Sequence, residues 1–263
     1  MTVLDWTRDD EFIVGGTSLA CRPRPTSNAR STADRFYIIK PRSLVERYEQ
    51  LIGQVAPRNI FELGIWDGGS TAFLAQLAHP AKLVAIDHMP GPCAALENFV
   101  EAHDLRNTVA TFYGVDQNDP ARISEIVERE YPGESLDLVI DDASHLVDET
   151  RNSFNVLFPR LAAGGTYVIE DWSWAHHDGP FRYGERLRRA TPLSVLLFEL
   201  MLVSAHHPKM IDQILIRPGL ALVRRGSEII DPGSFDVSAT YGEIGQDLMR
   251  RLSRARSDGE QGQ

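Results

Sequence analysis

Residues 136–172 read LDLVIDDASHLVDETRNSFNVLFPRLAAGGTYVIEDW and set the architecture of the chain. The apolar runs 136–140 and 165–169 predict two buried strands. Between them, residues 149–161 carry apolar side chains at helical spacing, and the Gly164-Gly165 pair ends this segment with a turn. A strand, a helix and a second strand in this order predict a crossover between parallel strands. Both strands then end at the same edge of one sheet.

Acidic residues and a histidine follow these two strands. Asp142 and His145 come after the first strand, and Glu170 and Asp171 come after the second. Because the crossover brings these groups to one sheet edge, we predict that they converge on a divalent cation. Carboxylates are hard oxygen donors that suit Mg²⁺ or Ca²⁺, and His145 is placed to act as a base beside the ion. Successive strand residues point to opposite faces, so Glu170 and Asp171 can share an ion only where the chain bends.

Strands and helices alternate through the rest of the chain. Apolar patterns predict further strands at 59–63, 82–87 and 109–113, and helices at 41–55, 71–77, 93–102, 121–130 and 191–205. A turn signature at 217–219 separates two short apolar runs and predicts a closing hairpin. We therefore expect an α/β fold with a doubly wound, mostly parallel, seven-stranded sheet that closes in an antiparallel hairpin. The domain is expected at 36–253, after an irregular arm or lid at 1–35 and before a polar tail at 254–263.

The composition is that of an ordinary globular protein, with 263 residues of which 43% are hydrophobic and 24% charged. A net charge of -10 argues against a nucleic-acid partner, because phosphates would be repelled. The two cysteines give neither a disulfide framework nor a zinc-binding spacing. Residues 1–11 are acidic where a signal peptide needs an apolar core, and the apolar run 193–205 is too short to span a bilayer. We expect a cytoplasmic protein without a membrane partner, and we also consider a homodimer.

Glycines after the strand at 59–63 predict a loop that approaches a ligand closely. Asp87, about 20 residues beyond this loop, is placed to accept hydrogen bonds from ribose hydroxyls. Acidic groups at three successive strand ends suit a ligand with a positive centre, with Glu62 facing an amino group and Asp116 facing adenine. The candidate nucleoside-binding residues are Glu62, Gly64, Gly68, Ser70, Asp87, Asp116, Gln117 and Asp141.

Alternatives stay open for both groups of residues. The glycine loop can be a plain strand-to-helix turn, and the acidic residues can be helix caps or solvated, with His145 on the surface. Asp141 can instead orient His145 or hold the start of the next helix. A nicotinamide-dependent oxidoreductase is disfavoured, because Trp66 occupies the second glycine position of the dinucleotide motif. A non-catalytic nucleoside-binding module is a further alternative.

Two motifs carry a family resemblance. Residues 62–70, ELGIWDGGS, resemble the S-adenosylmethionine loop of class I methyltransferases, and residues 142–145 with 170–171 resemble the metal and base motifs of the macrocin and mycinamicin sugar O-methyltransferases. The resemblance implies a Mg²⁺-dependent enzyme that methylates a sugar hydroxyl. It further implies Asp142, Glu170 and Asp171 as metal ligands and His145 as base.

The acceptor is less well defined by the sequence. The chain is also similar to the mycobacterial 1-O-methyltransferases of methylmannose polysaccharide biosynthesis, while a macrolide or another glycosylated metabolite is the alternative acceptor. Aromatic and imidazole side chains suit a sugar, and they follow the second strand on a polar loop. These candidate acceptor residues are Trp172, Trp174, His176, His177 and Tyr183. The two tryptophans can equally be packing residues, and Tyr37 is a candidate for closing over the nucleoside.

Overall fold

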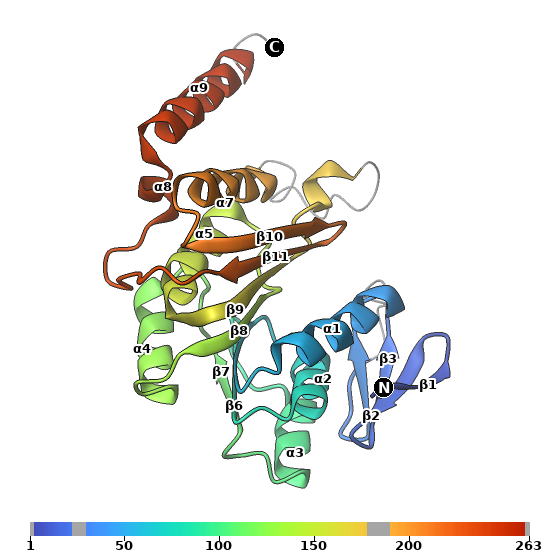
Figure 1. The fold of residues 1–263 in the computed structure, drawn as a ribbon. Coiled ribbons are helices and arrows are strands. Elements are labelled where there is room, and N and C mark those ends of the chain that lie inside the picture. The colour runs from blue at the N-terminus through green and yellow to red at the C-terminus, as the bar shows by residue number, and fades with distance from the viewer. Residues whose placement is uncertain (1–2, 23–29, 178–189, 261–263) are drawn as a thin grey trace. The chain divides into compact units, whose positions relative to one another are not determined.

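The computed structural model describes residues 3–22, 30–177 and 190–260, with side chains described up to residue 252 (Figure 1). The chain divides into two compact units, residues 1–144 and 145–263. No helix in the described ranges is long and apolar enough to cross a membrane.

The first unit opens with a small four-stranded sheet. Its strands, in the order β1-β2-β3-β4, are β1 (Asp5–Arg8), β2 (Glu11–Val14), β3 (Thr17–Cys21) and β4 (Arg35–Ile38). The strands are antiparallel except for the parallel pair β3 and β4. The expectation of an irregular segment at 1–35 is therefore wrong for much of its length. Strands of four or five residues show too few alternations to stand out in the sequence, although Phe12 and Val14 are buried on one face while Ile13 lies exposed between them.

The rest of the first unit alternates helices and strands as expected. The elements are α1 (Arg42–Val55), β5 (Asn59–Leu63), α2 (Gly69–Ala78), β6 (Lys82–Asp87), α3 (Ala94–Ala102), β7 (Val109–Tyr113), α4 (Pro120–Glu130) and β8 (Leu136–Asp141). Every residue of β5 is buried, and β5 pairs in parallel with both β6 and β8. A central strand with covered faces explains why its sequence is a continuous apolar run rather than an alternating one.

The second unit supplies the remaining strands and helices. They are α5 (Val147–Leu157), η1 (Phe158–Arg160), β9 (Leu161–Glu170), η2 (Trp174–His176), α7 (Ser194–His206), β10 (Ile211–Arg217), β11 (Leu220–Arg225), α8 (Val237–Thr240) and α9 (Gly242–Glu260). β10 and β11 form the predicted antiparallel hairpin, and β11 also pairs with β9. Helix α9 continues through most of the segment expected to be a polar tail.

The large sheet has the strand order β10-β11-β9-β8-β5-β6-β7. The prediction of a doubly wound, seven-stranded α/β sheet closed by a hairpin is confirmed. From β5 the chain builds outward first to β6 and β7 and later returns to β8 on the other side. In folds of this kind, ligands bind beyond the carboxyl ends of the strands at the point where the strand order reverses.

Candidate active site

The glycine loop after β5 is shaped by close packing. Gly64 has a φ of 101°, and a β-carbon there would overlap the backbone oxygen of Asp142. Gly68 has a φ of 80°, and a β-carbon there would lie 2.8 Å from the β-carbon of Leu96. Positive φ and lack of space together require glycine at both positions. Trp66 between them also has a positive φ, 46°, so the turn is tight along its whole length.

Asp87, at the end of β6, holds this loop in place. Its Oδ2 accepts hydrogen bonds from the backbone N–H groups of Ile65 and Trp66, both at 2.8 Å. Its Oδ1 accepts one from Met89 N–H at 2.8 Å. The predicted interaction with ribose hydroxyls remains a prediction, and the structure adds that the same carboxylate fixes the loop backbone.

Glu62 is a buried carboxylate at the end of β5, with 1% of its surface exposed. Thr71 Oγ donates to its Oε2 at 2.6 Å, whereas Oε1 is buried without a hydrogen-bond partner among the described residues. Burial raises the pKa of Glu62 from 4.5 to about 7, against the opposing effects of Ser70, Thr71 and the Lys40 charge. A buried acceptor oxygen without a donor is suited to a cationic group such as the ammonium of S-adenosylmethionine.

Gln117 and Asp141 form a buried pair beside the loop that leaves β8. Gln117 Nε2 donates to both carboxylate oxygens of Asp141, at 2.8 and 2.7 Å. Gln117 Oε1 accepts from the backbone N–H of Ser144 at 3.2 Å. The pair therefore ties the segment after β7 to the loop that carries Asp142. Asp116, by contrast, is exposed and accepts from the backbone N–H of Asn118 at 2.8 Å, so its predicted contact with adenine remains a prediction.

Lys40 is a site residue that the sequence reasoning missed. Its Nζ lies 2.7 Å from Oδ2 of Asp142, and only 4% of its side chain is exposed against 27% for Asp142. It stands between β4 and α1, 102 positions from its partner, so no local spacing reveals the pair. The sequence does mark Lys40 as unusual, because only three of the 27 basic residues in this chain are lysines.

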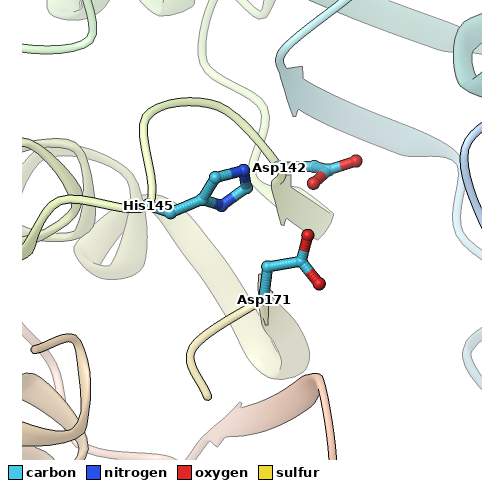
Figure 2. A group of neighbouring side chains, drawn as sticks. All are labelled: Asp142, His145 and Asp171. Atoms are coloured by element: carbon cyan, nitrogen blue, oxygen red, sulfur yellow. The ribbon is translucent and has the colours of Figure 1, made fainter. Parts of the chain in front are cut away.

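Asp142, His145 and Asp171 are neighbours, as Figure 2 shows. One ring nitrogen of His145 and one carboxylate oxygen from each aspartate lie within 4.8 Å of one another. His145 and Asp171 have left-handed backbone conformations, with φ of 56° and 54°. Such conformations are uncommon for residues other than glycine and cluster at functional sites. The positive φ at Asp171 bends the chain directly after β9. This is the bend that the alternation of strand residues requires if Asp171 is to face an ion.

Glu170, the third predicted metal ligand, is the last residue of β9 and is 2% exposed. It is not part of the group of Asp142, His145 and Asp171, which is the group with metal-ligand spacing found among the described residues. The alternation of side chains along a strand accounts for this separation, because Glu170 still belongs to the strand while Asp171 lies beyond it.

The candidate acceptor residues have varied surroundings. The ring of Trp174 lies 4.6 Å from the ring of His145, measured between centroids. Trp172 Nε1 donates to the backbone oxygen of Arg217 at 2.8 Å, which gives this tryptophan a structural role. His176 Nε2 lies 2.9 Å from Ser194 Oγ, and His177 Nε2 lies 3.3 Å from Ser173 Oγ. Tyr183 falls outside the described residues.

Residues 61–172 match the family model described as a methyltransferase domain. Demethylmacrocin O-methyltransferase of Streptomyces fradiae is 35% identical to this chain over 127 residues, which are 46% of this chain and 29% of that enzyme. Mycinamicin VI 2''-O-methyltransferase of Micromonospora griseorubida is 32% identical over 127 residues, which are 46% of this chain and 28% of that enzyme. This chain thus aligns with less than a third of each relative's length.

The solved structure of the MycE methyltransferase in complex with Mg, SAH and mycinamycin VI has a similar fold. Its TM-score is 0.51 at 24% identity, and the match covers 69% of this chain and 49% of that one. Two sequence motifs predicted a resemblance to the macrocin and mycinamicin enzymes. The sequence similarity to both enzymes confirms this prediction. Residues 61–172 of this chain therefore resemble a methyltransferase domain in sequence, and the fold resembles that of a solved methyltransferase.

Proposed function

We propose that this chain is a Mg²⁺-dependent O-methyltransferase that transfers the methyl group of S-adenosylmethionine to a sugar hydroxyl. The grouping of Asp142, His145 and Asp171 after the ends of β8 and β9 carries the proposal. The names of the aligned relatives, which are O-methyltransferases of macrocin and mycinamicin type, support it.

The chemistry of the first unit fits the cofactor. S-adenosylmethionine carries an ammonium and a sulfonium, and the buried Oε1 of Glu62 is an acceptor that has no donor in the described part of the chain. Gly64 keeps the loop free of a side chain where it passes closest to the loop after β8. The fixed backbone of this loop favours a nucleoside without a pyrophosphate, since Trp66 stands where a dinucleotide would need glycine.

The donor set near His145 fits a hard cation. Asp142 and Asp171 offer carboxylate oxygens, with Glu170 as a further proposed ligand, and oxygen ligands suit Mg²⁺ better than Zn²⁺. When bound, Mg²⁺ would lower the pKa of an acceptor hydroxyl and orient it. The carboxylates would hold the ion, and His145 would act as the base.

Methyl transfer is an in-line displacement, in which a hydroxyl oxygen attacks the methyl carbon as the carbon–sulfur bond breaks. The electron pair of that bond stays on sulfur, and His145 takes the proton from the hydroxyl. A base of this kind contributes roughly 10²- to 10⁴-fold in rate. Trp174 lies against the imidazole and offers a flat apolar face to a sugar ring.

The acceptor is proposed to be a small saccharide, and the specific candidate is the 1-OH of a methylated mannoside in methylmannose polysaccharide biosynthesis. A sugar on a macrolide is the alternative acceptor, in keeping with the relatives' names. Both acceptors carry vicinal oxygens that can approach a hard cation together.

The test is methyl transfer from S-adenosylmethionine to a panel of methylated mannosides and macrolide glycosides, followed by mass spectrometry in MgCl₂ or EDTA. We expect product only with Mg²⁺, and a loss of at least about 100-fold in Asp142→Asn and His145→Ala. His103→Ala is the matched control, because this exposed histidine packs on Phe99 in α3. Full turnover in EDTA refutes the metal role, and binding of NAD in place of S-adenosylmethionine refutes the cofactor. Cofactor binding without any methylated product favours a non-catalytic module.

A further inference from the structure

Lys40 is a nearly buried ammonium held against a proposed metal ligand. Its Nζ lies 2.7 Å from Asp142 Oδ2, with 4% of the lysine side chain exposed. The same Nζ lies 5.6 Å from the centre of the Tyr48 ring, which adds a favourable cation–π contact. A lysine is rarely buried without a specific partner, because removing an ammonium from water is costly.

The small N-terminal sheet fixes the position of the backbone from which the Lys40 side chain extends. Strand β4 ends at Ile38, two residues before the lysine, and both Phe36 and Ile38 are buried. A β-carbon on Gly69 would overlap the backbone oxygen of Tyr37, so β4 passes directly over the first residue of α2. Lys40 therefore follows closely after a packed strand.

The choice of lysine over arginine also carries information. Only three of the 27 basic residues in this chain are lysines. An ammonium is a compact point charge, whereas a guanidinium is a broad fork that would occupy both carboxylate oxygens. Lys40 contacts Oδ2 of Asp142, so a carboxylate shared between the ammonium and an ion is sterically feasible.

We propose that Lys40 is the counter-ion of the metal site. Its ammonium neutralises and positions Asp142 when no metal is bound, and its charge sets how tightly a divalent cation binds. This inference rests on the proposed Mg²⁺-dependent function. Lys40 is a positioning residue that acts through Asp142.

The sign of the effect follows from Coulomb's law. A positive charge in contact with Asp142 opposes a second positive charge on the same carboxylate, whether the metal displaces the ammonium or shares the carboxylate with it. Removing the ammonium leaves Asp142 without its ion-pair partner, which destabilises the metal-free protein. In this variant Mg²⁺ neutralises a carboxylate charge that the ammonium neutralises in the wild type, so Mg²⁺ binds more tightly.

The experiment measures Mg²⁺ binding by calorimetric titration with MgCl₂, and melting temperatures in EDTA and in saturating Mg²⁺. For Lys40→Met we expect Mg²⁺ to bind about tenfold more tightly or better. We also expect a lower melting temperature in EDTA, with most of the difference removed by Mg²⁺. Lys40→Gln guards against misfolding of the first variant, since it keeps a hydrogen-bond donor while losing the charge, and it should also tighten binding. Lys40→Arg keeps the charge and should not.

Lys82→Met is the matched control. Lys82 forms an ion pair of the same length, 2.7 Å, with Glu130, and it lies at the opposite end of its strand from the acidic groups. It should leave Mg²⁺ affinity unchanged. If the wild type binds Mg²⁺ and the neutral Lys40 variants bind it equally, the Lys40 inference is overturned while the proposed function stands. If the wild type binds no Mg²⁺, both fall.

Discussion

Replacing Glu62 with glutamine tests whether this buried carboxylate is reserved for a cationic ligand. Burial raises its pKa from 4.5 to about 7, so the folded protein holds this proton more tightly than the unfolded chain does. The stability linked to that proton is fully present below pH 4.5 and is lost as the pH rises through 7. Above pH 7 the ionised group therefore costs the folded state ~3 kcal/mol.

Glu62→Gln removes this charge and keeps an oxygen that can accept from Thr71. Removing the buried charge should stabilise the folded state, and the unsatisfied N–H donors of the new amide should offset part of this gain. We therefore expect the variant to be more stable than the wild type by about 1–3 kcal/mol at pH 8. The gain should shrink toward zero at pH 5, where the wild-type carboxyl is largely protonated. Urea denaturation at both pH values measures the difference. Glu128→Gln, in an exposed glutamate of α4, should show no such pH dependence.

The same substitution should weaken the cofactor site. Glu62 must lose its proton to pair with an ammonium, so wild-type affinity for S-adenosylhomocysteine should rise between pH 5 and 8. The variant should bind about 10- to 100-fold more weakly at pH 8 and show little pH dependence, because the charge-assisted hydrogen bond is absent. Equal binding by variant and wild type at pH 8, or a stability difference that is the same at both pH values, would refute the reasoning.

Two further substitutions test the packing of each unit. Gly64→Ala forces a β-carbon onto the Asp142 backbone at a φ of 101°, so it should lower the free energy of unfolding by at least about 2 kcal/mol in urea melts, and a change under about 0.5 kcal/mol would contradict the tight packing. Arg151→Met leaves Glu199, whose side chain is 5% exposed and lies 3.0 Å from Arg151, without its cation. This should cost about 3–5 kcal/mol in the same assay, and more at high pH because loss of Arg151 raises the pKa of Glu199 further. The exposed pair of Arg122 and Glu125 is the control, since Arg122→Met should cost under about 1 kcal/mol, and similar losses in both variants would argue against the buried pair.

The amino-acid sequence is sufficient to predict the large sheet and the residues at its strand ends. Apolar runs such as 59–63 and 136–140 are continuous because parallel strands are covered on both faces, and this leaves a clear local pattern. Right-handed crossovers then fix which strand ends share an edge, so the sequence predicts a group of Asp142, His145, Glu170 and Asp171, of which the structure brings Asp142, His145 and Asp171 together. These inferences need only periodicity and chain order.

The contacts that these residues make with distant parts of the chain follow only from the folded structure. The strands at 5–21 are too short to show a period, and the pair of Lys40 and Asp142 joins positions far apart in the chain. Glu170 is the last residue of β9 and stays outside the group, whereas Asp171 lies beyond the strand with a positive φ of 54° and joins it. Ion pairs and backbone angles of this kind arise from packing between distant segments, so they leave no periodic trace in the sequence.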